Sequence, residues 1–185
     1  RNAPNPLVKG EEGILFQPCF FYVDWVEWVP RDSGGGFVGR HDRCPDDAQA
    51  IEDEKNPNRR QFIRPNGNEV KETRYHVGYA VTPDGDSYPY VIPLTSSGHT
   101  VSRQWMFMMN SKQIPGIGKA DSWLCLYRLK TKQRTNAAGT WSVLDITDAG
   151  WVQTAEEVKR GADLFAAFAS GAKATEVPAM DTDQT

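Results

Sequence analysis

Long apolar runs are missing from this sequence. No stretch approaches the roughly 20 apolar residues that a membrane-spanning helix requires, and the first ten residues, RNAPNPLVKG, lack the apolar segment of a secretion signal. Cysteine is also scarce. Cys19, Cys44 and Cys125 are odd in number and far apart, without a CxxC pair, which argues against a disulfide framework. We therefore expect a cytoplasmic protein with no membrane partner.

Motifs for catalysis or metal binding are missing as well. No GxxxxGK[ST] phosphate loop occurs. Ser97, His99 and Asp121 could be combined into a triad, but the GxSxG turn that presents such a serine is absent. His41 and Cys44 form an HxxC pair without the four closely spaced ligands of a closed zinc site. We expect no enzyme activity, no metal and no cofactor.

The net charge of −3 conceals an uneven distribution. Residues 99–134 contain seven basic side chains and a single acid, Asp121, whereas the rest of the chain holds 14 basic and 23 acidic residues. A partner senses the local potential within about 10 Å of the surface at ordinary salt, so the net charge of the whole chain does not exclude an anionic partner. Solvated surface charges are the simpler explanation of this segment.

Four segments have patterns typical of β-structure or loops. Residues 13–29, GILFQPCFFYVDWVEWV, are aromatic and β-branched and predict one long or bulged strand. Residues 31–61 contain three adjacent glycines and dense charge, which predicts a long polar loop. Alternating runs that meet at TPDGDS and at NAAG predict β-hairpins over 72–95 and 122–147.

Two helices are expected. Val101, Trp105, Met108 and Met109 recur at helical spacing, which predicts a helix over 100–111 with Trp105 as a core anchor. A capping box of Thr154 and Glu157 opens the second, over 154–173.

The expected fold is mainly β: a five-stranded antiparallel OB-like barrel with an inserted short helix and a C-terminal helix, a β-sandwich being the alternative. One domain would span residues 13–171, between an N-terminal arm (1–12) and an acidic tail (172–185).

Cations and aromatic residues are interleaved in several stretches, among them RRQFIRP, TRYHVGY and LYRLKTKQRTNAAGTW. Binding of single strands requires both, because cations follow the phosphates and rings stack on the bases. The simpler explanation of each ring is core packing. The residues predicted to bind nucleic acid are Arg59, Arg60, Phe62, Arg64, Arg74, Tyr75, Tyr79, Arg103, Lys112, Tyr127, Arg128, Lys130, Lys132, Arg134 and Trp141.

Three passages, GHTVSRQWMFMMNSK, LYRLKTKQRTNAAGTWSVLDI and GWVQTAEEV, resemble in their layout the single-stranded DNA-binding proteins encoded by bacteriophages. That family combines an OB-fold barrel with an added helix, a long basic hairpin and an acidic C-terminal tail. The resemblance implies a role in phage DNA replication or recombination in the host cytoplasm, with little sequence preference. It also implies single-stranded DNA and replication or recombination proteins as partners, and it leaves a homo-oligomer open. The final residues, DTDQT, depart from the family pattern because they lack a terminal aromatic residue.

Two other classes of function stay open. A phage structural or assembly protein could use its basic strand to contact an acidic partner surface. A nuclease or another enzyme accessory to recombination could hold a metal with the acids of residues 46–54, although their spacing matches no EF-hand.

Overall fold

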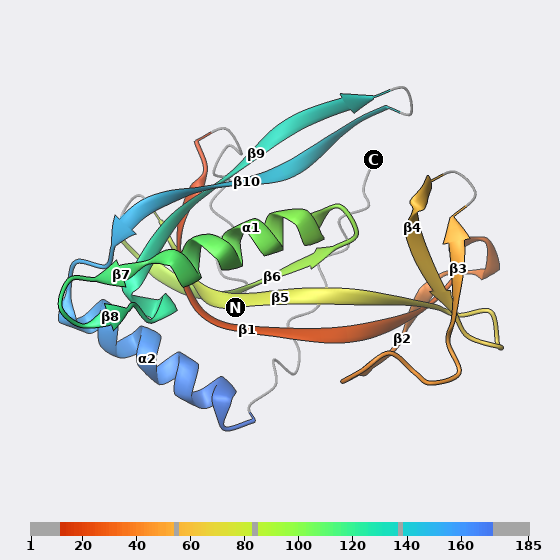
Figure 1. The fold of residues 1–185 in the computed structure, drawn as a ribbon, viewed down its shortest axis with the longest axis horizontal. Coiled ribbons are helices and arrows are strands. Elements are labelled where there is room, and N and C mark those ends of the chain that lie inside the picture. Colours follow the sequence, from red (N-terminus) through yellow and green to blue (C-terminus); the bar gives the residue numbers. More distant parts are fainter. Residues whose placement is uncertain (1–11, 54–55, 83–84, 137–138, 172–185) are drawn as a thin grey trace. The chain divides into compact units, whose positions relative to one another are not determined.

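The computed structural model describes residues 12–53, 56–82, 85–136 and 139–171, except for the side chains of 53, 56–59 and 136. The protein is mainly β (Figure 1). No helix in the described ranges is long and apolar enough to cross a membrane. The elements are β1 (Ile14–Val29), η1 (Arg31–Ser33), β2 (Gly36–His41), β3 (Gln49–Asp53), β4 (Asn56–Ile63), β5 (Glu69–Val81), β6 (Ser87–Thr95), α1 (Gly98–Ser111), β7 (Gln113–Ile114), β8 (Gly118–Lys119), η2 (Ser122–Leu124), β9 (Cys125–Asn136), β10 (Gly139–Trp151) and α2 (Ala155–Ala169).

Eight strands belong to one sheet, in the order β10-β9-β1-β5-β4-β3, with β2 paired to β1 and β6 paired to β5. β7 and β8 form a separate two-stranded sheet. The expectation of a mainly β fold with two helices is confirmed, but the closed five-stranded barrel is wrong. The sheet has more strands than that barrel, and among the described residues no pairing joins its end strands β10 and β3.

The region predicted as a long polar loop, residues 31–61, accounts for the additional strands. It contains β2, β3 and most of β4; β2 pairs antiparallel with β1, and β3 pairs antiparallel with β4. β2 and β3 escaped prediction because both of their faces are largely open to solvent in the described residues, as the exposed Phe37, Val38 and Ile51 show. Without a buried face there is no regular alternation of apolar and polar residues to recognise.

The other predicted elements are confirmed. β1 covers the long strand and carries a register irregularity between Glu27 and Trp28. The two hairpins are β5–β6 and β9–β10, and the helices are α1 and α2. Thr154 and Glu157 make both hydrogen bonds of the predicted capping box at the start of α2.

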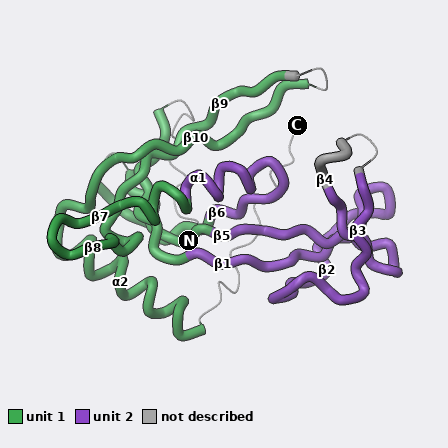
Figure 2. The backbone as a smooth tube through the Cα atoms, in the orientation of Figure 1, with its two compact units in different colours: residues 1–20, 76–91, 106–185 green, residues 21–75, 92–105 purple. Residues whose placement is uncertain are grey.

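The chain divides into two compact units (Figure 2). Unit 1 comprises residues 1–20, 76–91 and 106–185, and unit 2 comprises residues 21–75 and 92–105. Each unit is assembled from segments far apart in the sequence. The elements β1, β5, β6 and α1 each contribute residues to both units.

Unit 1 is organised around the fully buried side chain of Gln17 on β1. Its Nε2 donates hydrogen bonds to the carbonyl oxygens of Trp123, at 2.7 Å, and Glu157, at 2.9 Å. Its Oε1 accepts a bond from Nε of Arg160 at 3.3 Å. A Cβ at Gly161 would lie 2.6 Å from Gln17 Nε2, so α2 approaches β1 this closely only because position 161 is glycine. One buried amide thus joins β1, η2 and α2.

Trp105 on α1 is fully buried, whereas Phe107 on the same helix is 74% exposed. We expect Trp105→Ala to lower the free energy of unfolding by about 3–5 kcal/mol, because truncation of a buried indole leaves a cavity. Phe107→Ala, the matched control, should change it by less than about 0.5 kcal/mol. Chemical denaturation of both variants measures the difference. Equal stability of the two would contradict the assignment of Trp105 to the core.

Candidate nucleic-acid interface

Four of the predicted cations lie on one face of the β9–β10 hairpin. The hairpin belongs to unit 1 (Figure 2). β9 extends without interruption to Asn136, so side chains two residues apart point the same way. Across the hairpin these cations are in register with four residues of β10. We call this set the basic face: Arg128 opposite Thr147, Lys130 opposite Asp145, Lys132 opposite Val143, and Arg134 opposite Trp141.

The base of the hairpin is fixed by β1. The register pairs between β1 and β9 run from Ile14 with Leu129 to Phe16 with Tyr127. Tyr127 and Leu129 point away from the basic face and are buried. Just before β1, Gly13 has a φ of +71°, and a Cβ there would lie 2.4 Å from the carbonyl oxygen of Leu129. Glycine at this position allows the chain to lie against β9 beside the stem of Lys130.

Beyond this base the hairpin is open to solvent on both sides. Residues 131–135 and 139–142 are all exposed. The side opposite the basic face has neutral cross-strand pairs: Gln133 Nε2 donates to Ser142 Oγ at 3.0 Å, and the hydroxyls of Thr135 and Thr140 are 2.8 Å apart. We call Thr131, Gln133 and Thr135 the neutral face. The hairpin therefore presents its charge in one direction only.

The basic face combines the two features that single-strand binding requires. Trp141 is 38% exposed and is the register partner of Arg134, which places an accessible indole beside a guanidinium group. The sole acid on this face is Asp145, whose carboxylate contacts Lys132 Nζ, so three positive charges are in excess. Among the described residues, no carboxylate lies within ion-pair distance of Arg128, Lys130 or Arg134. Arg134 is exposed, and Arg128 and Lys130 are half-buried.

The other predicted residues of unit 1 have roles within the fold. Lys112 Nζ lies 2.6 Å from Asp148 Oδ1 and 4.6 Å from the ring centre of Trp151. The guanidinium of Arg160 lies 4.9 Å from the ring centre of Tyr79. Tyr127 is fully buried, and this burial raises the pKa of its hydroxyl. We leave Lys112, Tyr79 and Tyr127 out of the interface.

In unit 2, Arg64 belongs to an ion-pair cluster around the buried Glu27. Glu27 is 2% exposed and accepts hydrogen bonds from Arg64 Nη1 at 2.8 Å and from Asn68 Nδ2 at 2.6 Å, while His41 Nε2 lies 2.8 Å from its carboxylate. Arg64 Nη2 also contacts Asp47 at 2.9 Å. Burial alone would raise the pKa of Glu27, but these donors outweigh it and lower the pKa to about 2. The charge of Arg64 is thus used within the fold.

Two of the predicted aromatic residues in unit 2 pack against other rings. Tyr75 is buried and stacks on Tyr22, with the ring centres 4.8 Å apart and the planes inclined by 12°. Phe62 and Trp25 form a T-shaped pair, with the ring centres 5.0 Å apart and the planes inclined by 86°. Both rings contribute to packing, which was the simpler explanation at the outset.

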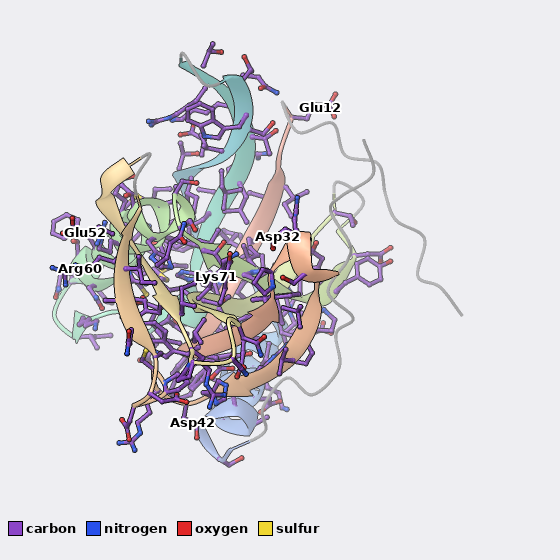
Figure 3. All side chains as sticks on the ribbon, turned by 90° about the vertical axis from the view of Figure 1, so that its right-hand side faces the viewer. Glu12, Asp32, Asp42, Glu52, Arg60 and Lys71 are labelled. Carbon is purple, nitrogen blue, oxygen red and sulfur yellow. The ribbon has the colours of Figure 1, made fainter. Side chains whose placement is uncertain are left out.

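The remaining predicted cations of unit 2 differ in their surroundings. Arg74 Nε lies 2.7 Å from a carboxylate oxygen of Glu72. Arg60 is exposed on β4 and is the register partner of Glu52, and both are labelled in Figure 3. Arg103 is exposed on α1. The side chain of Arg59 lies outside the described residues. The structure therefore gathers Arg128, Lys130, Lys132, Arg134 and Trp141 on one surface and gives most of the others structural partners.

Sequence reasoning missed two exposed rings in unit 1. Tyr88 and Tyr90 on β6 are 38% and 49% exposed. The Tyr-Pro-Tyr alternation places both on the same face of the strand, which is the signal that could have indicated them. Unit 1 also has an apolar pocket of about 370 Å³ lined by Ile114, Pro115, Leu124, Trp151, Val152 and Val158. No group of three or more potential metal ligands occurs in the part of the chain that the structure describes.

The chain belongs to the Pam3 phage gp34-like protein family, because the family's sequence model matches residues 2–174. The expectation of a bacteriophage protein is thereby confirmed. The comparison with curated proteins finds no significant match, and the comparison with solved structures finds none either.

The low pKa of Glu27 predicts a pH dependence of stability. A carboxyl whose pKa falls from 4.5 to about 2 on folding stabilises the folded state above about pH 4.5, and this contribution is lost as the pH falls towards 2. We expect Glu27→Gln to lower the free energy of unfolding by about 3 kcal/mol at pH 7. The difference from the unmodified protein should shrink between pH 4.5 and 2.

Asp46→Asn is the matched control, because its ion pair with Arg43 is 82% exposed on both sides. We expect this variant to change the free energy of unfolding by less than about 0.5 kcal/mol at any pH. Urea denaturation over a pH series measures both variants. A Glu27→Gln protein as stable as Asp46→Asn at pH 7 would show that the cluster contributes no net stability.

Proposed function

We propose that this member of the Pam3 phage gp34-like family binds single-stranded DNA through the basic face of the β9–β10 hairpin, in phage DNA replication or recombination. The observation that carries the proposal is the placement of four cations and one exposed indole on a single face, with a neutral face behind it. The resemblance of residues 93–160 to phage single-stranded DNA-binding proteins favours DNA as the ligand.

The arrangement suits a flexible single strand better than a duplex. Cations at every second position of a strand are about 6.6 Å apart, so they can follow a phosphate backbone that bends to meet them. Each phosphate contact on a single strand adds about 0.7 to the slope of log K against log salt. A base stacked on an exposed ring contributes about 1–3 kcal/mol irrespective of its identity. Binding would thus have little sequence preference and need neither cofactor nor catalysis.

A second candidate, a phage structural or assembly protein, is favoured by a different observation. Phe37 and Val38 on β2 and Ile51 on β3 are exposed, and in the described sheet β2 pairs only with β1 and β3 only with β4. An exposed apolar edge strand can pair with another chain. Titration of the full chain into fluorescent oligothymidylate at several salt concentrations separates the two candidates, and magnesium-dependent cleavage of the probe would indicate a nuclease.

The role of the cations can be tested by replacing both lysines of the basic face. Lys130→Ala/Lys132→Ala should weaken oligothymidylate binding and flatten its salt dependence by about 1–2 units, because two phosphate contacts are lost. Thr131→Ala/Gln133→Ala, on the neutral face of the same strand, should leave affinity and slope unchanged. Fluorescence anisotropy measures both. Equal effects of the two double variants would exclude a specific role for the basic face.

The role of the ring is tested separately. Trp141→Ala should weaken binding by about 1–3 kcal/mol without changing the salt slope, because stacking involves no ion release. Trp141→Phe should retain most of the affinity, since the smaller ring can still stack. If Trp141→Phe binds as weakly as Trp141→Ala, or if the slope falls with the affinity, Trp141 does not act as a stacking surface.

A further inference from the structure

Asp145 stands among the cations of the basic face. It is in register with Lys130, and its carboxylate contacts Nζ of Lys132, the next cation on the same side of β9. Neither member of this ion pair is buried: the side chains of Lys132 and Asp145 are 48% and 38% exposed. The carboxylate therefore lies on the same open surface that a phosphate would have to approach.

The ion pair contributes little to the stability of the hairpin. Exposed pairs of this kind are worth about 0–1 kcal/mol. The strands are held in register by their backbone ladder, which continues on both sides of Asp145 from Gly139 to Asp148. A phosphate can therefore displace the carboxylate from Lys132 at small cost.

We infer that Asp145 occupies, in the free protein, the position on Lys132 that a backbone phosphate takes in the complex, and that it thereby selects extended polyanions over single anions. This inference rests on the proposed function. A lone anion that displaces Asp145 exchanges one ionic contact for another and gains little. A nucleic-acid strand also contacts Arg128, Lys130 and Arg134. The free energy of these additional contacts exceeds the cost of displacing the carboxylate.

Asp145→Asn tests the inference because it keeps the shape and removes the charge. We expect tighter binding of fluorescent oligothymidylate, by up to about eightfold at 50 mM salt, and a salt slope steeper by about 0.7, corresponding to one more net phosphate contact. The control is Asp163→Asn on α2, which changes the net charge equally and removes the exposed partner of Lys159, 2.6 Å away. It should alter neither quantity. Equal effects of the two variants would overturn the inference.

A double-mutant cycle assigns the effect to Lys132. In a Lys132→Ala background, Asp145→Asn should tighten binding no more than Asp163→Asn does. If Asp145→Asn tightens binding as much without Lys132 as with it, the inference that Asp145 is displaced from Lys132 is wrong. Asp145→Ser provides a second uncharged variant, and its affinity and slope should match those of Asp145→Asn. Inorganic phosphate as competitor should be more effective against Asp145→Asn than against the unmodified protein, and equal competition would contradict selection against single anions.

The two proposals fail in different ways. If the unmodified protein and Asp145→Asn both fail to bind oligothymidylate at low salt, the proposed function is excluded and this inference with it. If the unmodified protein binds, and the lysine variants weaken that binding while Asp145→Asn leaves it unchanged, only the role of Asp145 is excluded.

Discussion

In the described part of the chain, β9 pairs with β1 only as far as Leu129. This limit decides which side chains of the β9–β10 hairpin are buried and which are exposed. Up to Leu129 one side of β9 packs into unit 1, which buries Tyr127 completely. From residue 131 onward the two strands have only each other as described partners, and every described side chain to the end of β9 is exposed. A two-stranded segment has no core of its own. Its side chains, Lys132 and Arg134 among them, can therefore serve a ligand, and the alternation of the strand places these two cations on the same side as Arg128 and Lys130.

Cations elsewhere in the protein serve a different purpose. Arg64 satisfies the buried carboxylate of Glu27 and contacts Asp47 as well, while Lys112 pairs with Asp148. Glu27 and Lys112 are largely buried, and removing the partner of a buried charge is costly, because that charge is left in a medium of low polarity. Lys132 differs because neither member of its pair is buried: the side chains of Lys132 and Asp145 are 48% and 38% exposed. The pairs that stabilise the fold each contain one largely buried member, Glu27 or Lys112, whereas the Lys132–Asp145 pair contains none.

The edge strands β2 and β3 pose a separate physical question. They present Phe37, Val38 and Ile51 to solvent, although an exposed apolar edge is a liability for a protein that must stay unassociated. β6 has exposed rings too, but Pro89 and Pro93 lack the backbone N–H group that a neighbouring strand would bond to. This disfavours the addition of another strand. Unit 2 thus has an edge suited to strand pairing, whereas unit 1 has a charged hairpin suited to a polyanion.

The sequence by itself determined the elements whose pattern reflects a buried face or a local motif. The long strand β1, both hairpins, the core position of Trp105 and the capping box of α2 follow from periodicity and short-range hydrogen bonding. The common orientation of Arg128, Lys130, Lys132 and Arg134 also followed from alternation once β9 was recognised as continuous. Tertiary structure alone decided the rest. The strands β2 and β3 have no buried face in the described residues to reveal them. The burial or pairing of Arg64, Tyr75 and Tyr127 depends on Glu27, Tyr22 and β1, each distant in the chain. A residue's type and its neighbours in sequence set its local geometry, but whether it is buried, paired or free depends on contacts that only the folded chain brings together.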